Sequence, residues 1–441
     1  MCGMPSVGVS SDRRCDRRMG GEEMEEIMRN KLMLPVAIVA LLALGLTGAA
    51  QAQIKISDTE DTKLYVTLAT VGTFQALDQR NVYDVKGVKL PSLTSGMQTA
   101  FGDLGFEGKF GKKQEIDMYF DLFLASRNHP STTYGDQGYL LVHGIPENLV
   151  GLHRVLDPLF KRVDVKVGAF LIDYGDNLYH RTNNAIAQAN PLVGNFVIDP
   201  NLVSVGGEVM SKPGKYNWLV GVTNGTNTED FSPGRGIAYN AKAWVYPIEP
   251  LRLSASVFHV KHSDSVTSRA TLFSGNRSGE RYGGVLGGGQ APGGILAAAG
   301  KNVLAYQFDG TWDDKLSPIK LYGHVGKTKD KDINGPLAGS PQETWKYYAG
   351  DVVYKLTSSV YAAARYSGAT ADQFGGANSN GKVRRIQVGG GLWATRNMLV
   401  KVEWVDQKYS GFLMGNVVNN GVDAGRSPQF KGLVSEVSFA F

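Results

Sequence analysis

Residues 114–126 read QEIDMYFDLFLAS, and apolar residues alternate with polar ones along the stretch. In an extended strand, successive side chains point to opposite faces. One face then carries only apolar side chains, namely Ile116, Met118, Phe120, Leu122 and Leu124. The other face carries Asp117, Tyr119 and Asp121. This strand fits half of a soluble sandwich, and it equally fits a barrel wall with lipid outside and water inside.

Similar alternation recurs along the chain and predicts sixteen strands. They are expected at about 63–77, 99–110, 114–126, 138–145, 162–173, 201–211, 216–224, 237–246, 251–262, 303–313, 318–328, 344–356, 360–368, 383–395, 398–408 and 430–441. An even number of strands is typical of bacterial transmembrane barrels made from one chain. The predicted fold class is therefore all-β, an antiparallel up-and-down transmembrane barrel of 16 strands, with 14 or 18 as alternatives.

The predicted connections alternate between short and long. The short ones are 111–113, 212–215, 247–250, 314–318, 357–359 and 396–397. The long ones are 78–98, 127–137, 174–200, 225–236, 263–302, 329–343, 369–382 and 409–429. Outer-membrane barrels show this segregation, with the short turns on the periplasmic side. One short connection, 146–161, runs to sixteen residues with helix-like spacing, which indicates either a small helix or a local register error.

Residues 28–52 read MRNKLMLPVAIVALLALGLTGAAQA. They combine a basic start, an apolar core over 32–46 and a small-x-small site at 50–52, which are the three parts of a cleavable signal peptide. A membrane anchor or a buried helix is the alternative, but the apolar core is short for a bilayer span. We interpret 1–27 as an upstream extension and 53–441 as the exported barrel.

Composition agrees with an exported barrel. Both cysteines, Cys2 and Cys15, lie in the predicted leader, so the exported part uses no disulfide. The mean hydropathy of −0.17 is too low for a bundle of membrane helices, and aromatic residues spread along the chain argue against disorder. The leader holds six basic and six acidic residues, so the net charge of +5 belongs wholly to the barrel. That small excess gives no reason to expect a nucleic-acid partner.

The last residues read FKGLVSEVSFAF and place Val437, Phe439 and the terminal Phe441 on one face. This ending resembles the assembly signal of outer-membrane barrel proteins. With sixteen strands and a long third loop, the chain resembles the trimeric porins of Gram-negative outer membranes. The segment 163–184 is similar to the phosphate-selective O/P branch, although the third loop lacks an Arg/Lys cluster and the PEFGG-like signature of enterobacterial porins is absent.

The resemblance implies passive diffusion of small hydrophilic solutes through each monomer of a homotrimer in the cell outer membrane. Its implied partners are outer-membrane lipid, lipopolysaccharide and, during biogenesis, the barrel-assembly machinery. Three other readings stay open. They are a substrate-specific monomeric channel, a barrel enzyme such as a lipase or protease, and a barrel sheath around a multihaem cytochrome in an electron conduit.

The third long connection is the predicted constriction of the lumen. From residue 176 it reads DNLYHRTNNAIAQANPLVGNFVIDP, a mixture of charged, amide and apolar residues. Apolar residues are unexpected in a solvated loop, so we expect it to pack against the inner barrel wall; an external loop covering its neighbours is the alternative. The candidate constriction residues are Asp176, His180, Arg181, Asn183, Asn184, Asn190 and Asn195.

Strand alternation also predicts which charges face the lumen. They are Asp103, Glu107, Asp117, Asp121, Lys166, Lys242, Arg252, Lys320, Arg365, Arg385 and Lys401. The hypothesis is that acids of the second and third strands face Arg252, Lys320, Arg365 and Arg385 across the pore and set up a transverse field. The alternative is that many of these charges are merely solvated above or below the constriction.

Motifs for catalysis, metals and cofactors are missing from the sequence. The histidines show no HExxH spacing, and no CxxCH haem site occurs. The Gly-rich run at 283–294 lacks the Lys-Ser/Thr of a phosphate loop and is interpreted as a flexible extracellular loop. We therefore expect a channel without catalytic residues, metal or cofactor.

Overall fold

The computed structural model describes residues 54–125, 133–225, 236–261, 272–273, 281–287, 294–295, 297, 300–331, 342–375, 377–418 and 421–441. The predicted extension (1–27) and signal peptide (28–52) lie outside the described residues. No helix of the described part is long and apolar enough to cross a membrane.

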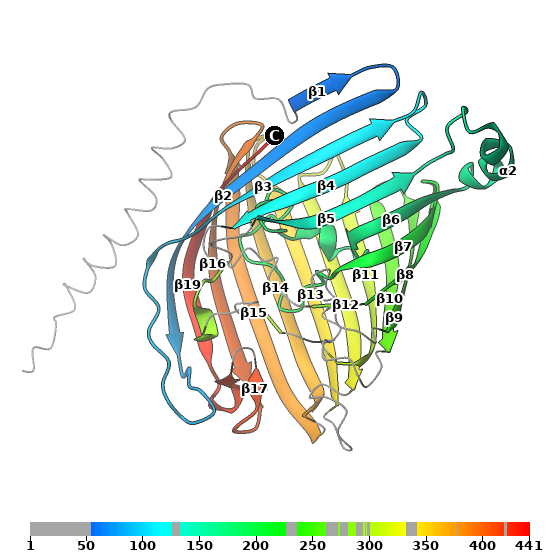
Figure 1. The fold of residues 1–441 in the computed structure, drawn as a ribbon. Coiled ribbons are helices and arrows are strands. Elements are labelled where there is room, and N and C mark those ends of the chain that lie inside the picture. Colours follow the sequence, from blue (N-terminus) through cyan, green and yellow to red (C-terminus); the bar gives the residue numbers. More distant parts are fainter. Residues whose placement is uncertain are drawn as a thin grey trace, which may run out of the picture. The chain divides into compact units, whose positions relative to one another are not determined.

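Sixteen long strands form one closed antiparallel barrel, which confirms the predicted fold class (Figure 1). They are β2 (Thr62–Arg80), β3 (Gly96–Phe110), β4 (Ile116–Ala125), β5 (Thr133–Val142), β6 (Val163–Leu171), β7 (Val203–Ser211), β8 (Tyr216–Thr223), β9 (Ile237–Ile248), β10 (Leu251–Lys261), β11 (Asn302–Asp313), β12 (Ile319–Lys331), β13 (Glu343–Lys355), β14 (Val360–Phe374), β15 (Ala377–Trp393), β16 (Met398–Ser410) and β19 (Gln429–Ala440). Each pairs with the next, and β19 pairs with β2 to close the ring.

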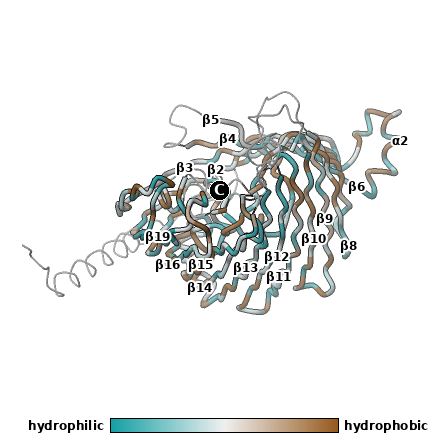
Figure 2. The backbone as a smooth tube through the Cα atoms, turned by 90° about the horizontal axis from the view of Figure 1, so that it is seen from below, coloured by the Kyte–Doolittle hydropathy of each residue, from teal (hydrophilic) through white to brown (hydrophobic). Residues whose placement is uncertain are grey.

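The outer face of the barrel wall is apolar and the inner face is polar, which is the reverse of the arrangement in a water-soluble protein. On β16, Val402 and Trp404 are 42% and 39% exposed. Glu403, which lies between them, and Lys401, which precedes them, are fully buried. Apolar and polar residues alternate in the same way along neighbouring strands (Figure 2). Since water-soluble folds hide their apolar face, an exposed apolar belt with a polar interior indicates lipid outside and a polar lumen inside.

One predicted connection is wrong. Residues 369–382 were expected to form a long loop because they are rich in Gly, Asn and Ser. Instead, β14 and β15 continue through most of this segment, with Thr370 paired to Lys382 and Gln373 to Asn378. Composition misled here because small polar residues also suit a long two-stranded hairpin whose backbone is fully paired.

The short connection at 146–161 contains α2 (Val150–Phe160), so the helix alternative is confirmed. The added strand β1 (Ile54–Asp58), which was not predicted, pairs with β2 just beyond the place where Phe441 bonds to Leu68. The other short elements are β17 (Val417–Val418), β18 (Val422–Asp423), η1 (Asn177–His180), η3 (Val285–Gly287) and η4 (Ala424–Arg426).

Candidate functional site

The segment 172–202, between β6 and β7, begins on charged side chains of the inner wall. Arg252 of β10 donates two hydrogen bonds of 2.9 Å to the Asp176 carboxylate, and Lys242 of β9 lies 2.9 Å from it. Lys242 also bonds Asp173 at 2.6 Å. Burial alone would raise the pKa of Asp176, but these two cations outweigh burial and hold the pKa below its usual range. Asp176 is therefore an ionised anchor between the loop and two strands.

The next strand holds the backbone at the same place. The Asp176 N–H donates to Asp309 of β11 at 3.0 Å, and Gln307 donates to the side chain of Asn177 at 3.1 Å. The Gly175 N–H donates to Ser256 at 3.0 Å. The start of the loop is thus tied to β9, β10 and β11 through both main chain and side chains.

Several of the predicted constriction residues hold the loop's own shape. Arg181 pairs with Asp199 through bonds of 2.9 Å, which brings two distant parts of the segment together. Asn195 accepts from the Thr182 N–H at 2.8 Å and donates to the Thr182 carbonyl at 2.9 Å. Asn190 donates to Asn195 at 3.1 Å. These buried amides satisfy backbone groups that a non-regular segment would otherwise leave unpaired.

Cations predicted to line the lumen bond instead to carbonyl oxygens of this loop. Arg365 of β14 donates to the carbonyls of Gly194 at 2.9 Å and His180 at 3.2 Å. Arg385 of β15 donates to the Asn195 carbonyl at 2.7 Å. Lys401 of β16 donates to three carbonyls, those of Ala187, Leu192 and Asn190, at 2.9, 2.9 and 3.2 Å. All three cations are buried.

Glu403 supplies the complementary charge. Its Oε2 accepts from the Val193 N–H at 2.8 Å and the Gly194 N–H at 3.0 Å. Gly194 sits so close to Tyr282 that a Cβ added there would lie 1.8 Å from the tyrosine oxygen. The tip of the loop therefore meets carboxylate, guanidinium and phenol groups at one point of the inner wall.

A second segment, 281–287, reaches the same wall. Tyr282 bonds to Glu403, and Arg281 donates to Glu436 of β19 at 2.7 Å and to the Asn184 carbonyl at 2.7 Å. Val285 and Leu286 are buried. The Gly-rich run 283–294 was interpreted as a flexible extracellular loop; within it, Val285 and Leu286 pack in the core, and residues 288–293 lie outside the described part.

His180 lies in an aromatic contact at the end of η1. Its ring stacks on Tyr322 with centroids 4.2 Å apart, and Phe196 meets Tyr322 edge-on at 5.9 Å. Burial, together with nearby Lys320 and Arg365, lowers the pKa of His180 to about 3. The imidazole is therefore neutral at physiological pH and acts as a packing group.

The remaining predicted residues have local partners or half-exposed positions. Asp117 meets Lys109 and His143, each at 3.3 Å. Lys166 bonds Glu208 at 2.7 Å, and Lys320 bonds Asp313 at 2.9 Å. Asp103 and Asp121 are buried, Glu107 and Asn183 are half-buried, and Asn184 is buried.

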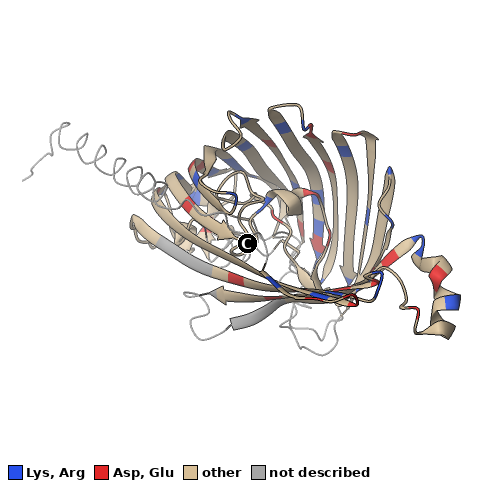
Figure 3. Ribbon diagram, turned by 90° about the horizontal axis from the view of Figure 1, so that it is seen from above, with Lys and Arg blue, Asp and Glu red and all other residues tan. Residues whose placement is uncertain are grey.

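The four cations of the transverse-field hypothesis are held by groups other than the acids of β3 and β4. Arg252 bonds Asp176, and Lys320 bonds Asp313. Arg365 makes two bonds of 2.7 Å to Asp351, and Arg385 bonds Gln407. Lys and Arg positions are spread over many strands of the wall (Figure 3). Only Lys320 of these four has a side chain more than a quarter exposed.

Sequence reasoning missed four of the anchoring residues, namely Asp199, Arg281, Tyr282 and Asp351. Strand alternation could have found Asp351, because it faces Arg365 directly in the register of β13 and β14. The other three lie in irregular segments, where no periodicity exists to find them. At the chain end, Val437 and Phe439 share one face of β19, and the rings of Phe439 and Phe441 are 5.6 Å apart.

No family model and no curated protein matches the sequence. Solved structures do match in three dimensions. An anion-selective porin from Comamonas acidovorans is 12% identical, with a TM-score of 0.53 over 86% of this chain and all of that chain. The outer membrane channel DcaP of Acinetobacter baumannii is also 12% identical, with a TM-score of 0.52 over 89% of this chain and all of that chain. OmpT, an outer membrane protein of Vibrio cholerae, is 8% identical at a TM-score of 0.52 over 88% of this chain and 99% of its own. This chain therefore has the sixteen-stranded barrel fold found in outer-membrane porins and channels.

Proposed function

We propose that this protein is an outer-membrane channel for passive diffusion of small hydrophilic solutes and ions. The observation that carries the proposal is a closed barrel that is apolar outside and polar inside. Export through the predicted signal peptide and assembly guided by Phe441 complete the route to the outer membrane, with lipid, lipopolysaccharide and the assembly machinery as partners. The same architecture gives no support to an enzymatic role.

The proposed constriction is the segment 172–202. Its support is the number of inner-wall groups that hold it, from Lys242 on β9 to Glu403 on β16. On this segment Tyr179 is exposed, and Asp173 and Asn183 are half-exposed. Solute would then pass between these side chains and the half-exposed inner residues of β3, β4 and β6, which are Glu107, Asp117, Tyr119 and Lys166.

A narrower, substrate-specific channel is the second candidate, and one observation favours it. Two segments distant in sequence, 172–202 and 281–287, meet at Glu403 and Glu436. Two inserted loops take more of the lumen than one loop does, and a barrel of sixteen strands is otherwise wide enough for an aqueous channel. We therefore propose low conductance with weak charge selectivity, since most inner cations are already neutralised by local partners.

The proposed oligomer is a homotrimer. OmpT of Vibrio cholerae, which shares this fold, has been solved in a trimer form. In a trimer with three independent pores, channel insertions into a bilayer should close in groups of three, and the detergent-solubilised mass should correspond to three chains.

Planar-bilayer recording of the purified protein tests the proposal. We expect ohmic current steps after addition of protein and a small reversal potential in asymmetric KCl. Absence of conductance from protein that migrates as a folded barrel would contradict a diffusion channel. Saturation of the current by one solute class, with low ion conductance, would favour the substrate-specific candidate over the general one.

A further inference from the structure

The helix α2 lies in the connection 143–162, at the end of the barrel where the other described connections are tight turns. It carries an exposed apolar stripe. Leu152, Val155 and Leu159 are 55%, 73% and 50% exposed. Their spacing of three and four residues places them along one side of a helix. Phe160 is buried and Leu156 is half-buried, so the helix packs through these two side chains while the stripe beside them stays exposed.

The other flank of α2 is polar and basic. Arg154 and Lys161 are exposed there, and Lys161 pairs with Asp157 at 2.8 Å. The polar and apolar flanks together make a short amphipathic helix. Figure 3 shows α2 outside the ring of strands, with charged residues along it. A helix of this kind binds at a membrane surface with its apolar side in the headgroup–acyl boundary.

Charge on the surrounding turns favours an anionic surface. The connections 111–115, 143–162 and 212–215 hold seven Lys and Arg but only three Asp and Glu. Of these acids, Glu115 is buried, and Glu147 is paired with Lys113 at 2.6 Å. The strands that flank α2 also continue the lipid-facing belt, with Leu140 on β5 and Val167 on β6 both exposed.

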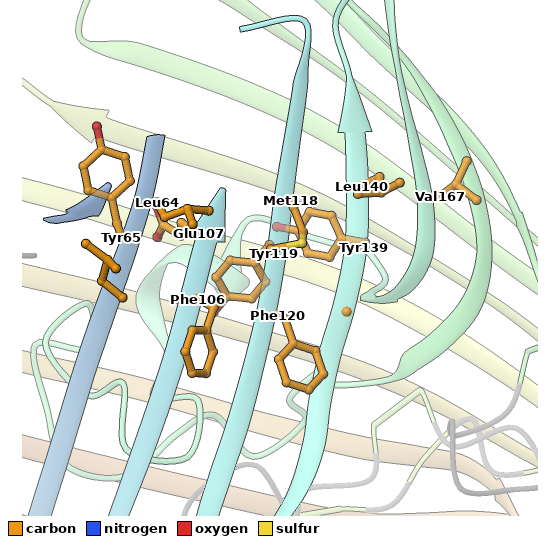
Figure 4. A pocket seen from close by; sticks show the side chains of 12 residues that line it. Leu64, Tyr65, Phe106, Glu107, Met118, Tyr119, Phe120, Tyr139, Leu140 and Val167 are labelled. Carbon is orange, nitrogen blue, oxygen red and sulfur yellow. The ribbon is translucent and has the colours of Figure 1, made fainter. Parts of the chain in front are cut away.

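That belt is hollowed over β2 to β6. A depression of about 640 Å³ crosses β2 to β6 (Figure 4). Its outward apolar lining comprises Leu64, Phe106, Met118, Phe120, Leu140 and Val167. The exposed apolar surface therefore includes β6, the strand that follows α2 in the chain.

From these observations we propose that α2 is an interfacial anchor that inserts its Leu152–Val155–Leu159 stripe into the leaflet at the short-turn end, and that anionic phospholipid headgroups contact its basic flank. The inference rests on the proposed placement of the barrel in a membrane. It adds a second, peripheral attachment that the barrel itself does not require. The stripe would fix the depth of the short-turn rim in the leaflet, and the basic flank would sense its lipid charge.

Site-specific fluorescence in vesicles tests the anchor, because residues 53–441 contain no cysteine. Single variants Val155→Cys, Arg154→Cys and Val167→Cys carry an environment-sensitive fluorophore on the stripe, the polar flank and the barrel belt. Each is reconstituted in vesicles of phosphatidylethanolamine and phosphatidylglycerol, after its folded state is checked by heat-modifiable gel mobility. Quenching is compared for nitroxide-labelled lipid and aqueous iodide.

The expected result is blue-shifted emission and lipid quenching for the labels at 155 and 167, with iodide quenching for the label at 154. Omitting phosphatidylglycerol, or adding R154Q, K161Q and R162Q, should reduce the shift at 155 and leave 167 unchanged. A label at 155 that iodide reaches while 167 stays in lipid overturns the anchor but not the membrane barrel. If iodide quenches the labels at 155 and 167 alike, both the anchor and the membrane barrel are overturned. If the label at 155 is protected from iodide but is not quenched by lipid, a second protein copy covers the stripe, and the anchor is overturned.

Discussion

The carboxylate of Glu403 lies 2.8 Å from the backbone nitrogen of Val193, and it caps the tip of the 172–202 segment from the middle of β16. The same oxygen accepts from Gly194, and the other oxygen accepts from Tyr282. One buried carboxylate thereby connects β16 to both segments, 172–202 and 281–287. Glu403 is therefore one of the wall groups that hold the proposed constriction in place.

Glu403→Gln should loosen the loop tip. The amide has one acceptor oxygen where the carboxylate has two, so buried N–H donors lose a partner at a cost of about 1–3 kcal/mol. We expect higher and noisier single-channel conductance together with a lower unfolding midpoint in urea. The matched control is Glu249→Gln in the exposed turn between β9 and β10, which should leave both unchanged. Unaltered conductance in a folded E403Q channel would refute the role of the loop tip.

Gly194→Ala should separate the two inserted segments. The new methyl would lie 1.8 Å from the Tyr282 oxygen and 2.3 Å from its ring carbon, which is closer than atoms can approach. Relief by displacement should cost about 1–3 kcal/mol. We expect altered conductance and lower stability, and partial recovery when Tyr282→Ala makes room. Gly214→Ala is the control, because the nearest atom to its Cβ lies at 3.9 Å. A neutral G194A would mean that the segments do not touch in the functional channel.

Arg365→Met should destabilise the barrel by about 3–5 kcal/mol, because it leaves the buried Asp351 carboxylate without its guanidinium. It also removes donors to the Gly194 and His180 carbonyls. Adding Asp351→Leu removes the unpaired charge, so the double variant should recover much of the unfolding free energy but not the loop contacts. Chemical unfolding of the parent, the two single variants and the double variant in vesicles gives the coupling free energy between Arg365 and Asp351. If the losses of unfolding free energy in the two single variants simply add up in the double variant, the Arg365–Asp351 pair is not what makes Arg365→Met destabilising.

Lowering the pH should destabilise the folded channel, and part of this loss of stability should come from His180. In the folded protein the pKa of His180 is about 3, whereas the unfolded chain titrates near 6.5. The unfolded state therefore binds the proton first, and the free energy of unfolding decreases as pH falls from 6.5 toward 3. His180→Phe keeps a ring on Tyr322 and removes the titration. We expect the variant to lose less stability than the parent between pH 7 and pH 4; equal losses would contradict the buried, neutral imidazole.

Lys320→Glu should move the reversal potential toward cation preference. Among the four cations of the transverse-field hypothesis, Lys320 has the most exposed side chain, and it faces Asp313 near the short-turn end of the lumen. Lys315→Glu, in the exposed short turn between β11 and β12, makes the same change in net charge and should have little effect. Equal shifts in the two variants would show that overall charge, and not a lumen position, sets ion preference.

The sequence by itself determined the barrel. Each strand carries its own period-two pattern, and alternation is local, so Ile116–Leu124 already separates an apolar face from a polar one, and the full series of strands assigns the apolar face to lipid. The even strand count and the segregation of short and long connections followed from the same local signal. The same signal also placed Lys242, Arg252, Arg365, Arg385 and Lys401 on the inner face.

Tertiary structure decided what those inner charges do. Arg365 and Lys401 satisfy carbonyls about 170 and 210 residues earlier in the chain, and irregular backbone has no period from which such partners could be read. The convergence of Arg281 and Tyr282 with the 172–202 segment likewise depends on barrel closure, which brings β16 and β19 beside β2. Buried polar groups must find partners wherever closure places them. Local alternation therefore fixes the wall, and only the closed barrel fixes how its lumen is filled.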